Sequence, residues 1–168
     1  SLEGRVSRLL AQLTLREKIA LLSGSDNWRT SAIPRRGIPA LTMTDGPHGV
    51  RVPRPAGSRR AGPATAFPTS VSLASTWNPA LIEQVGAALG EETLALGCDI
   101  LLGPCVNIMR TPLAGRNFES YSEDPCLAGR IGAAWVKGVQ SQGVAASLKH
   151  FACNNQEIER FRIDCLVD

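Results

Sequence analysis

Polar and charged side chains gather directly behind a short apolar segment near the end of this chain. Residues 144–148 read Val-Ala-Ala-Ser-Leu, and residues 149–157 read Lys-His-Phe-Ala-Cys-Asn-Asn-Gln-Glu. The second run brings a cation, an imidazole, amides and a carboxylate close together. In an α/β protein, polar groups just past the carboxyl end of a strand usually face a ligand site. The pattern therefore predicts a binding pocket behind a strand at 144–148.

The same arrangement occurs at two earlier points of the chain. Residues 45–51 read Asp-Gly-Pro-His-Gly-Val-Arg and follow the short strand pattern of residues 40–44. A further polar run leads from Gly103 to Glu119, behind the apolar residues 100–102. Because the carboxyl ends of parallel strands meet at one edge of a sheet, the three polar runs predict one shared pocket.

The segments between these runs carry the periodicity of helices. Asn78-Pro79 opens the first and Asp124-Pro125 the second, each as an N-cap followed by proline at the first helical position. Apolar residues then repeat on one face as far as Leu96 and Val139. The resulting order of strand, helix, strand, helix, strand predicts parallel strands joined by right-handed crossovers.

Two architectures share this order, a doubly wound open sheet and a β/α barrel. A nucleotide-binding open sheet would place a glycine-rich phosphate loop behind its first strand, and the chain has none. The long polar segments that follow strands, at 46–76 and 104–125, are instead typical of the active-site loops of a barrel. A closed barrel takes about 250 residues and eight strands. We therefore predict an α/β fold that is a partial TIM (β/α)8-type barrel, containing about the first three strands and their crossover helices.

The first part of the chain differs from the rest. Residues 6–13 and 15–22 have helical spacing, and Thr14 with Glu17 forms a capping-box pattern. Residues 25–39 read as loop. We expect one incomplete domain over 1–168, with helices and loop at 1–39 and the βαβαβ part at 40–168.

Composition excludes several classes of function. The chain is 43% hydrophobic with 18 basic and 15 acidic residues, which is ordinary for a globular domain. Four arginines lie close together at positions 51, 54, 59 and 60, a pattern also found in nucleic-acid-binding proteins. Such proteins usually add aromatic side chains that stack on bases, and only 5% of residues here are aromatic. A solvated loop is therefore favoured. No apolar run approaches the roughly 18 to 20 residues that cross a bilayer. We expect neither a nucleic-acid nor a membrane partner.

The cysteines predict a reducing compartment. There are five, an odd number, without Cys-x-x-Cys spacing, which disfavours a zinc site. We interpret them as small buried apolar groups, with Cys153 and Cys165 the one pair to test for a disulfide. This interpretation predicts a cytoplasmic protein. Secretion after removal of a leader is the alternative, since the chain begins with Ser1.

Five groups of residues together resemble the N-terminal domain of glycoside hydrolase family 3, especially its β-glucosidases. The resemblance runs from about Leu13 to Asp168. The groups follow one another in the family's order, which makes the signal specific. They are residues 14–18 with 21–24, 36–39, 45–51, 115–125, and 149–151 with 154–157 and Arg160.

The resemblance implies a pocket for a terminal sugar. Each sugar hydroxyl both donates and accepts, so carboxylates that accept and cations that donate fix which hydroxyl points where. In the family, the aspartate of the Asp-Gly-Pro motif holds hydroxyls at the non-reducing end, and it corresponds to Asp45. Without the resemblance, Asp-Gly-Pro is equally well a turn.

The same resemblance assigns three further residues to the sugar. Lys149 and His150 correspond to the family's paired donors to neighbouring hydroxyls. Arg116 corresponds to its sugar-contacting arginine. The alternative for Arg116 is an ion pair with Glu119 or Glu123 that orders the loop.

Arg51 and Arg160 also match pocket arginines of the family and are expected to assist. Each has a structural alternative, because Arg51 could brace Asp45 and Arg160 could brace Glu157. The remaining polar residues of the motifs are expected to serve the structure. Glu119, Glu123 and Asp124 are assigned to loop structure and helix capping, and His48 to a turn.

The bond-breaking groups are missing from this stretch. Retaining glycosidases need two carboxyl groups roughly 5 to 5.5 Å apart. The resemblance implies a nucleophilic aspartate in a Ser-Asp-Trp-type motif on a later strand and a glutamate acid/base from a following domain, and neither motif is present. We therefore expect no catalytic residue before Asp168, no metal and no organic cofactor.

The sequence thus predicts part of a retaining exo-acting β-glucosidase that hydrolyses terminal non-reducing β-D-glucosyl residues. Its expected partners are a β-glucoside or oligosaccharide substrate and the rest of the same polypeptide. Alone, these residues should be inactive and marginally stable, because a sheet edge stays unpaired. The alternatives are a β-xylosidase or other exo-glycosidase of the family, and a non-catalytic sugar-binding remnant.

Overall fold

The computed structural model describes residues 1–51 and 62–166. The arginines at 54, 59 and 60, for which a solvated loop was predicted, lie outside the described residues. The chain forms two compact units, Ser1–Met43 and Thr44–Asp168, and each is described by itself.

The first unit consists of two helices and a short 3-10 helix. They are α1 (Leu2–Ala11), α2 (Leu15–Ser23) and η1 (Pro34–Arg36). The predicted capping box is confirmed: Glu17 N donates to Thr14 Oγ1 at 3.3 Å and Thr14 N donates to Glu17 Oε2 at 2.8 Å. The Arg35 guanidinium also hydrogen-bonds this carboxylate and lowers the pKa of Glu17 to about 2. Thus Glu17 ties α2 to η1.

The second unit contains the sheet, with strand order β1-β2-β3. The strands are β1 (Met43–Asp45), which begins at the end of the first unit, β2 (Ile100–Leu102) and β3 (Ala145–Ala146). β2 and β3 are parallel, with Ile100 opposite Ala145. β3 is shorter than predicted, yet main-chain hydrogen bonds continue beyond it: Lys149 N donates to Pro104 O at 2.8 Å, and Val106 N donates to Lys149 O at 2.8 Å. The α/β class with parallel pairing is confirmed.

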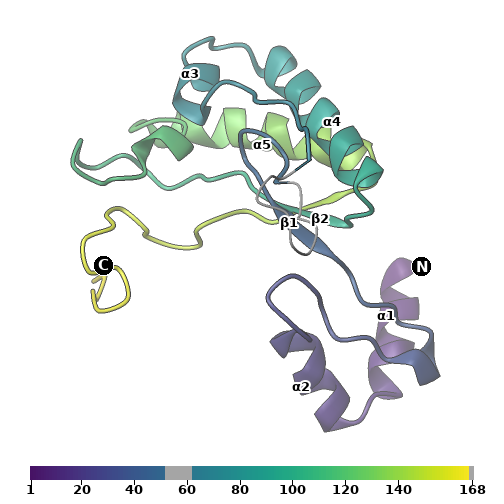
Figure 1. Cartoon of the computed structure of the whole chain (residues 1–168). Helices are drawn as coiled ribbons and strands as arrows, with labels where there is room; N and C mark the ends of the chain where they lie inside the picture. The colour runs from purple at the N-terminus through teal and green to yellow at the C-terminus, as the bar shows by residue number, and fades with distance from the viewer. Residues whose placement is uncertain (52–61, 167–168) are drawn as a thin grey trace. The chain divides into compact units, whose positions relative to one another are not determined.

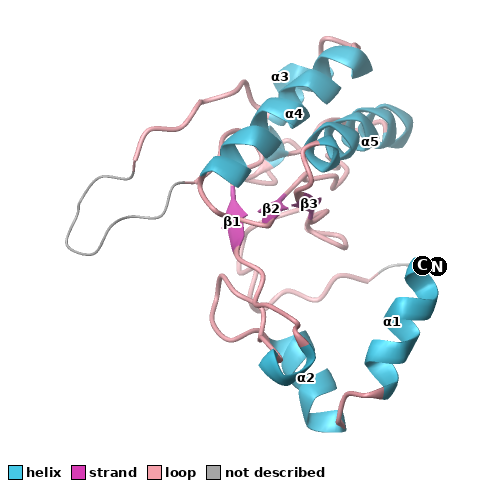
Figure 2. Ribbon diagram, turned by 90° about the vertical axis from the view of Figure 1, so that its right-hand side faces the viewer, coloured by secondary structure: helices cyan, strands magenta, loops and turns pink. Residues whose placement is uncertain are grey.

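Two long helices cover one face of this sheet, as Figures 1 and 2 show. They are α4 (Pro79–Ala95) and α5 (Pro125–Ser141). Both predicted N-caps are confirmed, because Leu81 N donates to Asn78 Oδ1 at 3.1 Å and Cys126 N donates to Asp124 Oδ1 at 2.7 Å. A third helix, α3 (Ser70–Ala74), was predicted as loop. Five residues are too few to show helical periodicity.

The core lies between these helices and the sheet. Its fully buried side chains include Ile82, Leu89, Leu101, Ile131 and Trp135. A continuous apolar run such as Ile100-Leu101-Leu102 is typical of a strand covered on both faces. Among the described residues, Leu101 is fully buried while its two neighbours in β2 are only partly buried. The second face of β2 therefore remains partly open in the described part of the chain.

The helices α4 and α5 approach at a pair of glycines. A Cβ atom on Gly138 would lie 2.1 Å from Glu83 O and 2.9 Å from Gly86 Cα. A Cβ atom on Gly86 would lie 2.4 Å from Trp135 O. The two backbones are therefore in direct contact, and only glycine fits at either position.

Gly138→Ala should accordingly destabilise the full-length protein by about 3 kcal/mol, because the methyl group forces two packed helices apart. Denaturant unfolding measures the change. Gly129→Ala on the same helix is the matched control, since no atom lies within 4 Å of the added Cβ. That control should be neutral or stabilising by about 0.5 to 1 kcal/mol. Equal unfolding midpoints for the two variants would contradict the close crossing.

Candidate functional site

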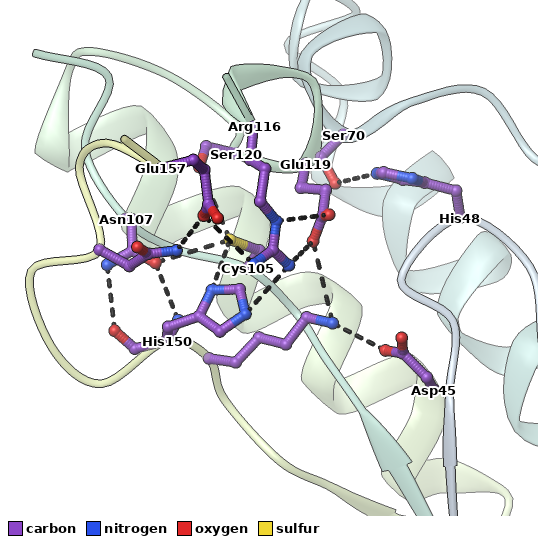
Figure 3. A network of polar contacts seen from close by, with 12 residues as sticks. Asp45, His48, Ser70, Cys105, Asn107, Arg116, Glu119, Ser120, His150 and Glu157 are labelled. Atoms are coloured by element: carbon purple, nitrogen blue, oxygen red, sulfur yellow. Dashed lines mark hydrogen bonds and ion pairs between the residues drawn. The ribbon is translucent and has the colours of Figure 1, made fainter. Parts of the chain in front are cut away.

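Side chains from the ends of all three strands meet in one polar network (Figure 3). Asp45 ends β1, Arg116 lies in the loop behind β2, and Lys149 and His150 follow β3. The structure thus brings together four of the six residues that the sequence singled out as sugar-binding. All four belong to the second unit.

The turn behind β1 sets the position of Asp45. Gly46 has φ +139°, and a Cβ atom there would lie 2.0 Å from Gly49 O. Arg51 N closes the turn by donating to Asp45 O at 2.7 Å. Because a side chain at position 46 would collide with the backbone, glycine is required there. Asp-Gly-Pro is therefore a turn, and it leaves the Asp45 carboxylate within reach of the other strand ends.

Lys149 links the first strand end to the second. Its Nζ donates to Asp45 Oδ1 at 2.8 Å and lies 3.8 Å from Glu119 Oε2. Burial alone would raise the pKa of Asp45, but the hydrogen bond and charge of Lys149 outweigh it and the pKa lies below its usual value. Asp45 is therefore a carboxylate at neutral pH, and its two oxygens act as acceptors.

Arg116 makes the densest set of contacts in the network. Its guanidinium donates to both carboxylate oxygens of Glu119, each at 3.0 Å, and to Glu157 Oε1 at 3.3 Å. These contacts, with Glu119 first, raise the pKa of Arg116. The predicted alternative for Arg116, an ion pair with Glu119, is thus observed, and the guanidinium is fixed in orientation.

His150 lies between Arg116 and the loop behind β2. Its Nε2 is 3.1 Å from Arg116 Nη2, and its Nδ1 is 3.6 Å from Cys105 Sγ. Burial, followed by the charges of Arg116 and Lys149, lowers the pKa of His150. A guanidinium has no acceptor, so Arg116 donates and Nε2 accepts. This direction differs from the donor role that the resemblance implied for His150.

Arg51 and Arg160 lie at the edge of the network. Arg51 Nη1 is 3.9 Å from Asp45 Oδ2, with 69% of the side chain exposed. Arg160 Nη1 donates to Glu157 Oε2 at 3.0 Å, with 45% exposed. Both structural alternatives, bracing of Asp45 and of Glu157, are therefore seen. Arg160 is the less exposed of the two.

Glu119 has a larger role than sequence reasoning gave it. It was assigned to loop structure, yet its carboxylate contacts both Arg116 and Lys149. Glu119 lies in the short 3-10 helix η2 (Asn117–Glu119), three residues after Arg116. In the sequence, this spacing of two opposite charges was the signal that Glu119 pairs with Arg116. Its second cation, Lys149, could be found only from the fold.

Asn107 was not singled out at all. Its side chain, only 9% exposed, bonds the main chain of His150 at two points. The signal in the sequence was an amide between the apolar residues Val106 and Ile108. A buried amide needs hydrogen-bond partners, and here they come from the strand end opposite.

His48 does more than form a turn. Its Nε2 lies 3.0 Å from Ser70 Oγ, and its ring centroid lies 5.7 Å from that of Phe118. Burial lowers the pKa of His48. The ring therefore joins the Asp-Gly-Pro turn to α3 and to η2, and it supports the network from the side.

The cysteines match the expectation only in part. All five are free, so Cys153 and Cys165 form no disulfide. Cys98 and Cys105 are buried as predicted, but Cys126 and Cys165 are exposed, which contradicts the interpretation of all five as buried apolar groups. Cys126 lies in the first turn of α5, where the helix end meets solvent.

Two kinds of feature are absent from residues 1–51 and 62–166. No group of three or more His, Cys, Asp and Glu side chains there is arranged to hold a metal ion. In the same residues, no helix combines the length and the apolar character needed to cross a membrane.

The network as a whole alternates in charge. Carboxylates, which accept hydrogen bonds, and cations, which donate them, take turns along it. The order is Asp45, Lys149, Glu119, Arg116, Glu157 and Arg160. Fixed acceptors beside fixed donors match a ligand whose groups both donate and accept, above all a ring of hydroxyls.

Comparison with known proteins gives the family. Residues 9–158 match the model of the glycosyl hydrolase family 3 N terminal domain. The chain is 52% identical over 167 residues to thermostable beta-glucosidase B of Acetivibrio thermocellus, which covers 97% of the chain and 22% of that protein. It is 47% identical to the probable beta-glucosidase I of Neosartorya fischeri, covering 96% of the chain and 19% of that protein. The chain thus spans about a fifth of the length of these relatives.

Solved structures agree. Beta-glucosidase 3B from Thermotoga neapolitana, in complex with alpha-D-glucose, superposes with a TM-score of 0.82 at 47% identity, over 91% of this chain and 24% of that one. A beta-glucosidase from Kluyveromyces marxianus gives a TM-score of 0.84 at 45% identity, over 90% and 18%. These neighbours confirm the predicted fold as a portion of the family's TIM-type barrel. The chain belongs to glycosyl hydrolase family 3, as part of its N-terminal domain.

Proposed function

We propose that the full-length protein is a retaining exo-acting β-glucosidase, and that these residues supply part of its glucose pocket. The observation that carries the proposal is the alternating network at the three strand ends, centred on the 2.8 Å contact of Lys149 with Asp45. The names of the relatives support the activity, and a neighbour solved with alpha-D-glucose supports the ligand.

The geometry suggests a role for each side chain. The Asp45 carboxylate accepts hydrogen bonds from two neighbouring hydroxyls, while Lys149 and Arg116 donate to others. His150 Nε2 accepts from the Arg116 guanidinium and holds it in place beside the sugar. Arg51 and Arg160 assist from the edge. Hydroxyl contacts of this kind strengthen in the transition state and so raise the rate of glycoside cleavage.

The nucleophile and the acid/base are proposed to come from residues beyond Asp168. A general acid of a glycosidase needs a raised pKa. The pKa values of Asp45 and Glu157 are both lowered, because nearby cations and hydrogen bonds outweigh burial. Glu119 is occupied by Arg116 and Lys149. These three carboxylates therefore suit binding rather than proton donation.

The full-length protein tests this proposal. We expect it to hydrolyse p-nitrophenyl β-D-glucoside in preference to the β-D-xyloside, and not the α-D-glucoside. Proton NMR of the early product should show β-glucose, the sign of retention. A preference for the xyloside would contradict the substrate, and glucose binding without any turnover would show a sugar-binding remnant instead.

A further inference from the structure

His150 is held by the loop behind β2 through its main chain (Figure 3). Asn107 Nδ2 donates to His150 O at 3.0 Å, and His150 N donates to Asn107 Oδ1 at 2.8 Å. One buried amide thus satisfies both main-chain groups of His150, as a neighbouring strand would. The contact spans 43 positions of the sequence. It fixes the backbone from which the imidazole projects.

The ring of His150 is held by the same loop. Cys105 Sγ lies 3.6 Å from Nδ1, 3.6 Å from Asn107 Oδ1 and 3.6 Å from Ser120 Oγ. Cys105 is 3% exposed and Ser120 is 5% exposed. Water is therefore largely excluded from this side of the ring, and polar groups there must satisfy one another.

The partners of His150 allow one consistent set of hydrogen-bond directions. Arg116 is a donor without a lone pair, so Nε2 carries no hydrogen. A neutral imidazole then carries its hydrogen on Nδ1, where it donates to Cys105 Sγ. The thiol hydrogen in turn donates to Asn107 Oδ1, which also accepts from His150 N.

We propose that Asn107 and Cys105 are positioning residues for His150, which they hold as the Nδ1–H tautomer with the Nε2 lone pair toward Arg116. The proposal rests on the proposed function, in which Arg116 donates to glucose. His150 then acts as a third fixed partner of the Arg116 guanidinium, beside Glu119 and Glu157. Asn107 and Cys105 therefore act on the sugar through His150 and Arg116.

The first test reads the tautomer directly and needs no activity. Neutron diffraction from a deuterated crystal of the full-length protein should show a deuteron on Nδ1 of His150 and none on Nε2. A deuteron on Nε2 would overturn the proposal. Because this result does not involve turnover, it stands even if the protein hydrolyses no β-glucoside and the proposed function fails.

The second test uses two matched cysteines at opposite ends of β2. Cys98 and Cys105 are each 3% exposed, so replacement by alanine removes a similar buried thiol from each. Cys105→Ala should lower kcat/KM for a β-glucoside about 5- to 20-fold and raise the inhibition constant of glucose in parallel. Cys98→Ala should leave both unchanged.

Conservative replacement separates positioning from packing. In Cys105→Ser a hydroxyl still accepts from Nδ1 and donates to Asn107, so kcat/KM should return to within about 3-fold of wild type. Asn107→Ala removes both main-chain contacts, and kcat/KM should fall about 10- to 100-fold. An active wild type in which Cys105→Ala and Asn107→Ala bind glucose normally would overturn the proposal and leave the proposed function intact.

Discussion

Replacing Asp45 with alanine in the full-length protein should lower kcat/KM for a β-glucoside roughly 10²- to 10⁴-fold. Asp45 is the carboxylate at the end of β1, and Lys149 holds it ionised at 2.8 Å. Two hydroxyl contacts to a charged acceptor contribute several kcal/mol in the transition state, and each 1.36 kcal/mol is a factor of ten. Steady-state kinetics across substrate concentrations measures the loss, which should fall on kcat as well as KM.

Two further variants define this effect. Asp45→Asn keeps one acceptor oxygen and should lose less than the alanine variant. Asp164→Ala removes a carboxylate that is exposed near the end of the described chain and should leave kcat/KM unchanged. Near-normal kcat/KM in Asp45→Ala would remove Asp45 from the sugar pocket and leave the Asp-Gly-Pro turn as its only role.

Glu119→Gln should lower kcat/KM about 10²-fold and destabilise the full-length protein by roughly 2 to 4 kcal/mol. Glu119 accepts two hydrogen bonds from Arg116 and lies 3.8 Å from Lys149. Without its charge, two largely buried cations lie close together with less compensation, which is costly in a site of low polarity. Both cations are proposed donors to glucose, so their displacement should weaken transition-state binding. Kinetics and denaturant unfolding give the two values.

Glu123→Gln is the matched control for this prediction. Glu123 lies four residues further along the same loop and is exposed. It should therefore change kcat/KM less than about 2-fold and stability by less than about 0.5 kcal/mol. If Glu119→Gln behaved like this control, Glu119 would be an ordinary loop residue, as the sequence first indicated.

The sequence predicted those parts of the fold that depend on local chemistry. Asn78 and Asp124 were recognised as N-caps because a capping side chain bonds residues two or three positions away. The helix α3 was missed because its formation depends on surroundings in space. His48, for example, reaches Ser70 across 22 positions. β3 was predicted too long because the chain leaves regular geometry while its hydrogen bonds continue to Lys149.

For the site, too, the sequence predicted the features that depend on strand order and missed those that depend on loop conformation. Convergence of Asp45, Arg116 and Lys149 followed from the order of the strands, because strand ends of a parallel sheet share an edge. That Lys149 and Asp45 share one pocket, although they lie 104 positions apart, needed only that rule. The position of Glu119 between two cations and the two-point contact of Asn107 needed the conformations of the loops. Those conformations depend on tertiary packing, which periodicity does not reveal.

A crystal structure of the full-length protein with glucose tests the central claim most directly. We predict that two adjacent hydroxyls of glucose lie within hydrogen-bond distance of the Asp45 carboxylate, and others within reach of Lys149 and Arg116. The anomeric carbon should face a carboxylate from beyond Asp168. Glucose bound elsewhere, with the Asp45–Lys149 contact untouched, would contradict the assignment of this network as the sugar pocket.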